Sequence, residues 1–218
     1  MSYLTNPDEI YRESFEIINK EVDLSKLPFD IAPIAERIIH ACGMPEILGD
    51  LRISPDLAST VSTALLNGAA IFVDAEMLKS AIIPRMLPAH TDVICTLNDP
   101  QAAKIGKAKN ITRSAAGVEL WADKVKDAIV VIGNAPTALF RLLELIDEGM
   151  AKPAAIIAFP VGFVGAAEAK QELHNNPRAI AYATLLGRKG GTAMAGAAVN
   201  AITRNLKSQT LSAAGLEQ

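Results

Sequence analysis

The stretch AIVVIGNAPTALFRLLEL, residues 128–145, constrains the fold of this chain more than any other segment. An uninterrupted apolar run, Ala128–Ile132, ends at Gly133 and Asn134, and a helical pattern with Pro136 in its first turn follows at once. Runs of β-branched residues are typical of strands that are covered on both faces, as in parallel sheets. We expect Asn134 to cap the helix, with the proline at its start. The segment therefore predicts a buried strand that leads directly into a helix.

The same alternation recurs along most of the chain. Apolar strand patterns lie at residues 69–73, 93–96, 154–159 and 179–184, and helical patterns separate them. With residues 128–132 they predict a five-stranded parallel sheet inside a three-layer α/β/α sandwich. The topology rules require right-handed crossovers but leave the strand order open. Because ligands of such sheets bind beyond the carboxyl ends of the strands, we expect functional residues in the loops that follow them.

Size and composition favour a single domain at residues 1–205, followed by a flexible tail at residues 206–218. The formal net charge of −3 and the 5% aromatic content argue against a nucleic-acid-binding surface. The most apolar run, residues 154–167, is too short and too interrupted by proline and glycine to cross a membrane. Cys42 and Cys95 lie in apolar segments without metal-ligand spacing, and the first residues lack a signal-peptide pattern, so we expect a cytoplasmic protein.

Three helices are expected before the first strand, and the first two carry candidate site residues. Asn6 and Pro7 begin the first helix, whose inward-facing line contains Ile10, Ser14 and Ile18. A serine on such a line either bonds back to a helical carbonyl or contacts a ligand. The pattern alone leaves both explanations of Ser14 open.

The second helix is expected to be capped by Asp30 and to end at Gly43, with His40 in its last turn. His40 is either a surface residue that the helix dipole favours or a proton donor, because histidine exchanges protons near neutral pH. After the first strand, we expect Asp74 to cap the next helix.

Three later segments carry candidate binding residues. Arg113 begins a helix and opposes its dipole, so it is either a solvated side chain or part of an anion site. Residues 160–165 are apolar and rich in glycine, which suits either a flat apolar ligand or a buried turn. Residues 187–192 suit a nest for a carboxylate or phosphate, although they lack the full spacing of a P-loop or a dinucleotide motif. They precede a long helix that we expect to end near Arg204.

Several unusual segments occur together and in a fixed order. They are IIHACG around His40, TRSAAG around Arg113, VIGNAPTALF, FPVGFVGAAEAK and GRKGGTAMAGAAVNA. In this combination the chain resembles the precorrin-8X methylmutase family of cobalamin biosynthesis over roughly residues 5–205. Two or three of these segments alone would not suffice, since short motifs match by chance.

The resemblance implies an isomerase that moves a methyl group from C-11 to C-12 of precorrin-8X or cobalt-precorrin-8, to give hydrogenobyrinic acid or cobyrinic acid, without an added cofactor and without a protein-bound metal. It implies a flavodoxin-like fold with strand order 2-1-3-4-5 and a homodimer with the site near the subunit interface. His40 matches the family's catalytic histidine, and Ser14 and Arg113 match substrate-site positions.

A tetrapyrrole substrate is an apolar disc with a rim of carboxylates, so apolar glycine-rich backbone and local cations suit it. The expected substrate-binding residues are Ser14, Arg113, Asn134, Thr137, Pro160, Gly162, Phe163, Arg188, Lys189, Gly190, Gly191 and Thr192. Two alternatives stay open, a tetrapyrrole carrier without catalysis and a nucleotide- or phosphate-binding flavodoxin-like protein. The sequence also leaves open whether the substrate carries cobalt.

Overall fold

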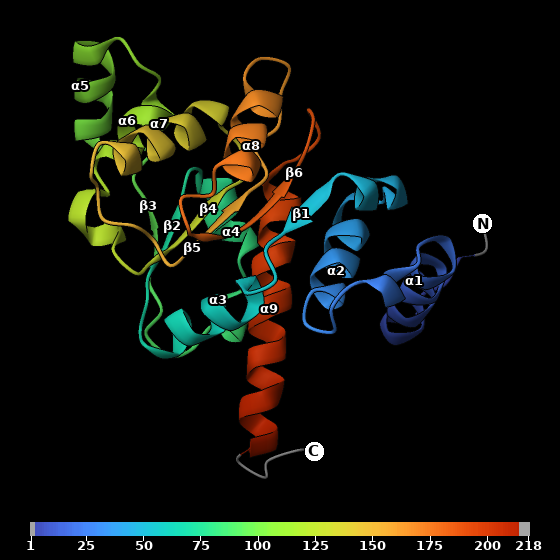
Figure 1. Cartoon of the computed structure of the whole chain (residues 1–218). Coiled ribbons are helices and arrows are strands. Elements are labelled where there is room, and N and C mark those ends of the chain that lie inside the picture. Colours follow the sequence, from blue (N-terminus) through green and yellow to red (C-terminus); the bar gives the residue numbers. More distant parts are fainter. Residues whose placement is uncertain (1–2, 214–218) are drawn as a thin grey trace.

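A computed structural model describes the backbone of residues 3–213 and the side chains of this range except residues 123 and 209–213. Its sheet has the strand order β1-β6-β5-β4-β2-β3 (Figure 1). The strands are β1 (Leu51–Ile53), β2 (Ile71–Val73), β3 (Val93–Cys95), β4 (Ile129–Ile132), β5 (Ala155–Ala158) and β6 (Ala181–Leu185). Strands β2 to β6 are parallel to one another, and β1 is antiparallel to β6.

The five expected strands are all present, and their order along the sheet is the expected 2-1-3-4-5. The expectation of a purely parallel, five-stranded sheet is wrong, because β1 adds a sixth strand in the described chain and makes the sheet mixed. β1 is a three-residue edge strand whose residues are only partly buried. It pairs with β6 so that Leu51 lies opposite Leu185 and Ile53 lies opposite Ala183. A short edge strand carries little apolar signal, so pattern reasoning missed it.

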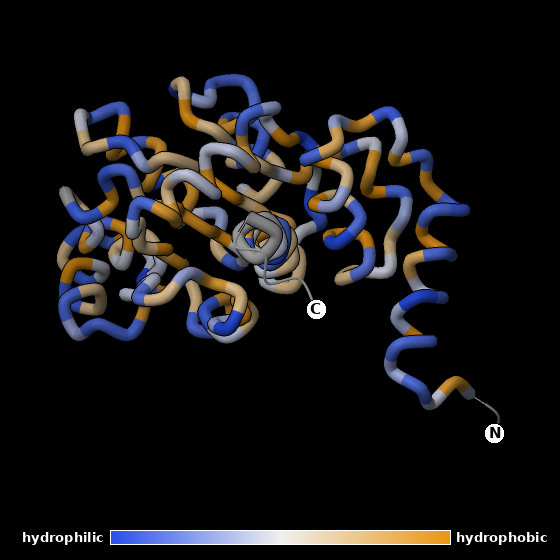
Figure 2. The backbone as a smooth tube through the Cα atoms, turned by 90° about the horizontal axis from the view of Figure 1, so that it is seen from below, coloured by the Kyte–Doolittle hydropathy of each residue, from blue (hydrophilic) through white to orange (hydrophobic). Residues whose placement is uncertain are grey.

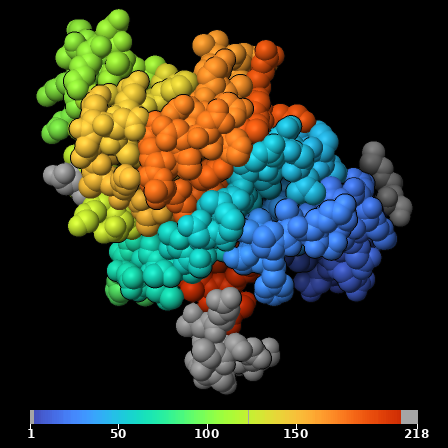
Figure 3. All heavy atoms as spheres, in the orientation of Figure 1, coloured from blue at the N-terminus to red at the C-terminus, as the bar shows by residue number. Residues whose placement is uncertain are grey.

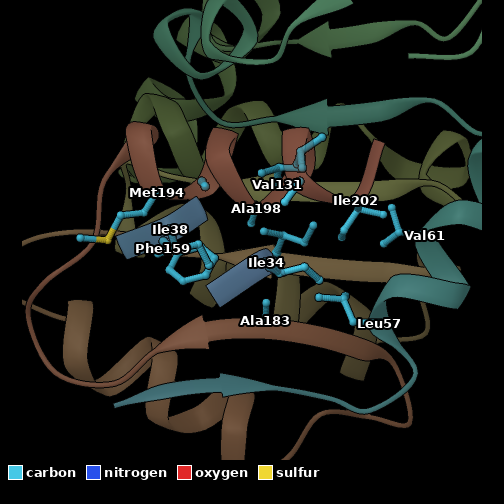
Figure 4. Packing of buried hydrophobic residues seen from close by; sticks show 14 of the residues in the cluster. Ile34, Ile38, Leu57, Val61, Val131, Phe159, Ala183, Met194, Ala198 and Ile202 are labelled. Atoms are coloured by element: carbon cyan, nitrogen blue, oxygen red, sulfur yellow. The ribbon is translucent and has the colours of Figure 1, made fainter. Parts of the chain in front are cut away.

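Helices cover both faces of the sheet, which confirms the three-layer sandwich. They are α1 (Pro7–Glu21), α2 (Ala32–Cys42), α3 (Leu57–Leu66), α4 (Glu76–Ala81), α5 (Pro100–Lys109), α6 (Arg113–Glu119), α7 (Pro136–Asp147), α8 (Ala166–Asn175) and α9 (Thr192–Ala213). Successive strand residues point to opposite faces, so one buried strand supplies both cores. Val131 packs with α2, α3, α4 and α9 (Figure 4), whereas Val130 packs with α6, α7 and α8.

The ends of the helices confirm some of the capping predictions. The Asn6 side chain accepts hydrogen bonds from the amides of Asp8 and Glu9, and Gly43 ends α2 with φ of 67°. The Asp30 cap is wrong, because α2 begins one residue later than the pattern suggests, and Ile31 occupies the cap position without a side-chain bond. Pro33 in the first turn of α2 has no backbone N–H, so this turn has one amide fewer that needs a capping acceptor.

Helix α9 continues to Ala213, so the expected end near Arg204 is wrong. Part of the expected tail is therefore helical, and residues 214–218 lie outside the described residues. No helix in residues 3–213 has the length and apolar character that crossing a membrane requires.

Helix α1 lies at the periphery of the molecule and packs on α2 (Figures 1 and 2). Ile18 is buried as expected, but Ile10 is 45% exposed and so does not belong to the inward-facing line. The reason is that α2 and α9 contact only one side of α1, so Ile10 has no described element packed against it in the single chain. This leaves an apolar face of α1 open in the single chain.

Candidate functional site

The loops after β4, β5 and β6 meet at the carboxyl edge of the sheet. The amide of Gly162 donates to the carbonyl of Arg188 at 3.2 Å, and the amide of Gly191 donates to the carbonyl of Phe159 at 2.7 Å. A methyl group on Gly190 would lie 2.3 Å from the Phe159 carbonyl oxygen, so only glycine allows this approach. These contacts join residues 159–165 and 187–192 into one unit.

The loop after β4 joins the same unit. A methyl group on Gly133 would lie 2.9 Å from Cα of Thr192, and one on Gly165 would lie 3.2 Å from the ring of Phe140 on α7. We call residues 133–137, 160–165 and 187–192 the loop cluster. It contains ten of the twelve residues that the sequence predicts for substrate binding, with Asn134 and Thr137 exposed and Pro160 buried.

The surface of the loop cluster combines an apolar tip with cations. Phe163 is 85% exposed and Val164 is 89% exposed. The guanidinium of Arg188 lies 5.5 Å from the centre of the Phe163 ring, and Lys189 forms an ion pair of 2.6 Å with Glu46. Exposed apolar side chains beside a cation suit a flat ligand with acidic substituents.

Arg113 begins α6 at the side of the loop cluster that borders α7. The hydroxyl of Thr112 accepts the amide of Ala115 at 3.2 Å and shares a hydrogen bond of 2.7 Å with Thr137. Arg113 itself is exposed and has no ion pair with any described residue. An unpaired guanidinium at this position is available to an anionic ligand.

Asp74 occupies the crevice between β2 and β4, where the strand order reverses and where such sheets usually bind ligands. Its carboxylate is 3% exposed and accepts the amides of Gly133, Asn134 and Ala135 at 2.9, 3.0 and 2.7 Å. Burial raises the pKa of this carboxyl, and the three amides oppose that shift.

Two capping predictions are therefore wrong for one reason. Asp74 does not cap α4, and Asn134 does not cap α7, because the Asp74 carboxylate already takes the free amides before α7. The amides that would hold a phosphate in a nucleotide-binding relative of this fold are thus occupied by the protein's own anion. This weakens the phosphate-binding alternative at that crevice.

A second group of residues lies on α1 and α2. The hydroxyl of Ser14 and Nδ1 of His40 share a hydrogen bond of 2.9 Å, and the Phe15 ring stacks on the imidazole with centres 4.8 Å apart. The Ser14 hydroxyl therefore bonds the side chain of His40 and not a carbonyl of its own helix. His40 is exposed but oriented, which differs from both a freely solvated and a buried histidine.

The structure adds three residues that the sequence reasoning missed, namely Tyr11, Arg37 and Arg204. Arg37 and Arg204 both donate to the hydroxyl of Tyr11, the second at 2.6 Å, and they border a pocket of about 270 Å³. Burial lowers the pKa of Arg37, the charge of Tyr11 opposes that, and the charge of Arg204 adds to the lowering. Neither guanidinium has a carboxylate partner among the described residues.

We call Tyr11, Ser14, Phe15, Arg37, His40 and Arg204 the helix cluster. Its sequence signal is the three-residue spacing shared by the two helices, 11 and 14 on α1 and 37 and 40 on α2. Residues three apart lie on one helix face, so both pairs can meet across the helix contact.

Within one chain, the pocket beside the helix cluster is lined by residues of α1, α2 and α9 and by no residue of the loop cluster. Helix α2 and helix α6 lie toward opposite sides of the molecule, as the ribbon and the space-filling view both show (Figures 1 and 3). The ion pair between Lys189 and Glu46 and the hydrogen bond from the amide of Leu186 to the carbonyl of Asp50 join the loop after β6 to the segment after α2. That all the site residues gather around a single cavity stays a prediction.

Comparison with known proteins decides the family. The family model described as "Precorrin-8X methylmutase" matches residues 9–205. This chain belongs to the precorrin-8X methylmutase family.

Its relatives in this family include both named substrate types. The precorrin-8X methylmutase of Pseudomonas aeruginosa is 46% identical over 202 residues, covering 93% of this chain and 97% of that protein. The cobalt-precorrin-8 methylmutase of Methanothermobacter thermautotrophicus is 38% identical, covering 89% of this chain and 91% of that protein. The solved structure of the precorrin-8x methyl mutase from Thermus thermophilus has a TM-score of 0.79 at 33% identity, covering 92% of this chain and 98% of that chain.

Proposed function

We propose that this isomerase moves the methyl group from C-11 to C-12 of precorrin-8X, within cobalamin biosynthesis, and that His40 is the proton donor. The observation that carries the acid role is the hydrogen bond of 2.9 Å between Ser14 and Nδ1 of His40. In a protonated imidazole both ring nitrogens carry hydrogen, so Nδ1–H donates to the serine and Nε2–H is left for the substrate. Stacking on Phe15 restricts the ring to one plane.

The reaction needs little more than such an acid. The bond from the methyl group to C-11 breaks as the bond to C-12 forms, so atoms are conserved within the substrate. Protonation of the conjugated system by His40 draws electron density away from the migrating group and lowers the barrier to the methyl shift. Because an isomerisation consumes no proton overall, His40 recovers the proton when the product forms.

The cations of both clusters suit the carboxylate rim of the substrate. Arg113, Arg188 and Lys189 come from the loop side, and Arg37 and Arg204 come from the helix side. Guanidinium groups bind carboxylates with two parallel hydrogen bonds, which fixes orientation as well as charge. The half-buried ring of Phe15 and the exposed ring of Phe163 suit the faces of the disc.

We infer that a homodimer completes the site, with the helix cluster of one subunit opposite the loop cluster of its partner. The support is that α1 leaves Ile10 and Ile17 largely exposed, while Phe163 and Val164 are exposed on the loops. Exposed apolar side chains beside the helix cluster and in the loop cluster are typical of an interface. An isologous two-fold dimer would form two such sites at once.

We propose that the substrate is the metal-free precorrin-8X. Relatives named for precorrin-8X are 46% and 45% identical to this chain, whereas the cobalt-precorrin-8 methylmutase of Methanothermobacter thermautotrophicus is 38% identical, which favours the metal-free substrate. We propose one domain over residues 1–205. The free thiols of Cys42 and Cys95 support the cytoplasmic location that the sequence predicts.

The test is a direct assay with precorrin-8X and, in parallel, cobalt-precorrin-8. The expected result is a change in the visible spectrum at unchanged mass, as the conjugation of the macrocycle is altered. His40→Ala is expected to lower kcat by about 100-fold or more and to keep affinity for the pigment. His174→Gln is the matched control, because His174 shares a 2.7 Å hydrogen bond with the hydroxyl of Tyr182 away from both clusters.

Each other outcome has a distinct meaning. Tight pigment binding with no conversion by the unmodified protein would identify a carrier. Full turnover by His40→Ala, with His174→Gln also active, would remove the acid role from His40.

A further inference from the structure

Lys170 on α8 is the most deeply buried charged residue in the described part of the chain, with an exposed fraction of 0%. Its ammonium donates a hydrogen bond of 2.5 Å to the backbone carbonyl of Lys189 in the loop cluster. No described carboxylate pairs with it. An ammonium group buried without an anion is costly, because it loses its hydration and gains no opposite charge.

Stability does not explain why a lysine occupies this position. Apolar side chains that replace buried charges are often neutral or stabilising, so a methionine would fill the same space at lower cost. Burial lowers the pKa of Lys170 to about 8, which reflects that cost. Charged residues that are retained against stability concentrate at functional sites.

The partner of Lys170 indicates what that function is. Three of the four residues from 188 to 191 are held by hydrogen bonds: the Arg188 carbonyl by the amide of Gly162, the Lys189 carbonyl by Lys170, and the Gly191 amide by the Phe159 carbonyl. Of these contacts, the one made by Lys170 is the only one that involves a side chain. This hydrogen bond fixes the backbone at Lys189, from which the side chains of Arg188 and Lys189 extend.

We propose that Lys170 is a positioning residue, whose ammonium group holds the Lys189 carbonyl so that the side chains of Arg188 and Lys189 are presented to the carboxylates of the substrate. This inference rests on the proposed role of the loop cluster in substrate binding. Lys170 itself does not touch the substrate. Its removal therefore affects the KM for precorrin-8X and leaves the chemical step intact.

The experiment compares Lys170→Met, Arg188→Gln and the double variant with the unmodified enzyme. Losing a hydrogen bond from a charged donor is expected to raise KM about tenfold, with kcat within about twofold. If Lys170 acts through the loop, the two substitutions are not additive, and Arg188→Gln adds little in the Lys170→Met background. Lys152→Met is the matched control, because Lys152 also donates to a backbone carbonyl, that of Arg178, at the other edge of the sheet.

The outcomes separate this inference from the proposed function. No effect of Arg188→Gln would reject substrate binding by the loop cluster, whereas an effect of Arg188→Gln without one of Lys170→Met would reject only the positioning role. Fully additive effects would also reject it. If neither Lys170→Met nor Lys170→Gln folds, Lys170 serves stability and the inference is overturned.

Discussion

Ser14 of α1 and His40 of α2 share a hydrogen bond of 2.9 Å between the serine hydroxyl and the imidazole Nδ1 atom. The two residues are 26 positions apart in the sequence and meet because α1 packs on α2. The bond selects which ring nitrogen faces away from the protein, which is a requirement for directed proton transfer. The packing of α1 on α2 therefore sets the orientation of the His40 ring.

Ser14→Ala is expected to lower kcat about tenfold and to leave KM nearly unchanged, because His40 stays in place but loses the partner that orients its ring. Steady-state kinetics with precorrin-8X measures both constants. Ser80→Ala is the control, since Ser80 only bonds back to the Glu76 carbonyl of its own helix. A kcat equal to that of Ser80→Ala would show that the orientation of His40 has another cause.

Mixing two inactive variants tests whether the site is shared between subunits. His40→Ala removes a group of the helix cluster, and Arg113→Ala removes a group beside the loop cluster. In a mixed dimer, one shared site therefore carries both defects and the other carries none. Random reassociation in equal amounts is expected to restore about a quarter of the unmodified activity.

The control mixes His40→Ala with Ser14→Ala, which alter the same cluster and should give no such recovery. Sedimentation of the mixture confirms the dimer. An inactive mixture of His40→Ala and Arg113→Ala that still sediments as a dimer would place the whole site in one subunit.

Asp74→Asn is expected to destabilise the protein by about 2 kcal/mol, because three amides lose a charged acceptor and the new amide group faces a donor. Urea denaturation measures the change in the free energy of unfolding. Asp56→Asn is the control, since Asp56 precedes α3 without a side-chain capping bond. Equal stability of the two variants would mean that the Asp74 bonds contribute little.

The stability of the unmodified protein relative to Lys170→Met is expected to increase as the pH rises from about 8 toward 10.5. The pKa of Lys170 is lowered in the folded state, so in this window the unfolded chain binds the proton that the folded chain has released. Stability rises with pH wherever the unfolded state binds more protons. Denaturation of both proteins across this window measures the difference, and a difference that is independent of pH would contradict the burial of a titrating ammonium.

Part of the fold could be predicted from local pattern alone. The run from Ala128 to Ile132 and the helix with Pro136 at its start are β4 and α7 as expected, because an apolar β-branched run and a proline at a first turn act within a few residues. The same holds for Asn6 at the start of α1 and Gly43 at the end of α2. The loop segments shared with the family also supplied the list of candidate site residues.

Other features depended on contacts between distant segments. Asp74 and Asn134 both carry good capping signals, yet the Asp74 carboxylate bonds amides about 60 positions away, and this longer-range arrangement displaced both caps. β1 became a strand only because β6 offered a free edge. Propensity is a weak prior that tertiary contacts override.

The sequence by itself determined the alternation of strands and helices, the apolar faces that bury them and the chemical types in the loops, since these depend on neighbours a few residues apart. Only the tertiary structure decided that Ser14 meets His40, that Arg37 and Arg204 converge on Tyr11, and that the buried ammonium of Lys170 holds the Lys189 carbonyl. The physical reason is that hydrogen bonds and charges act over a few ångströms in space, whatever the separation along the chain.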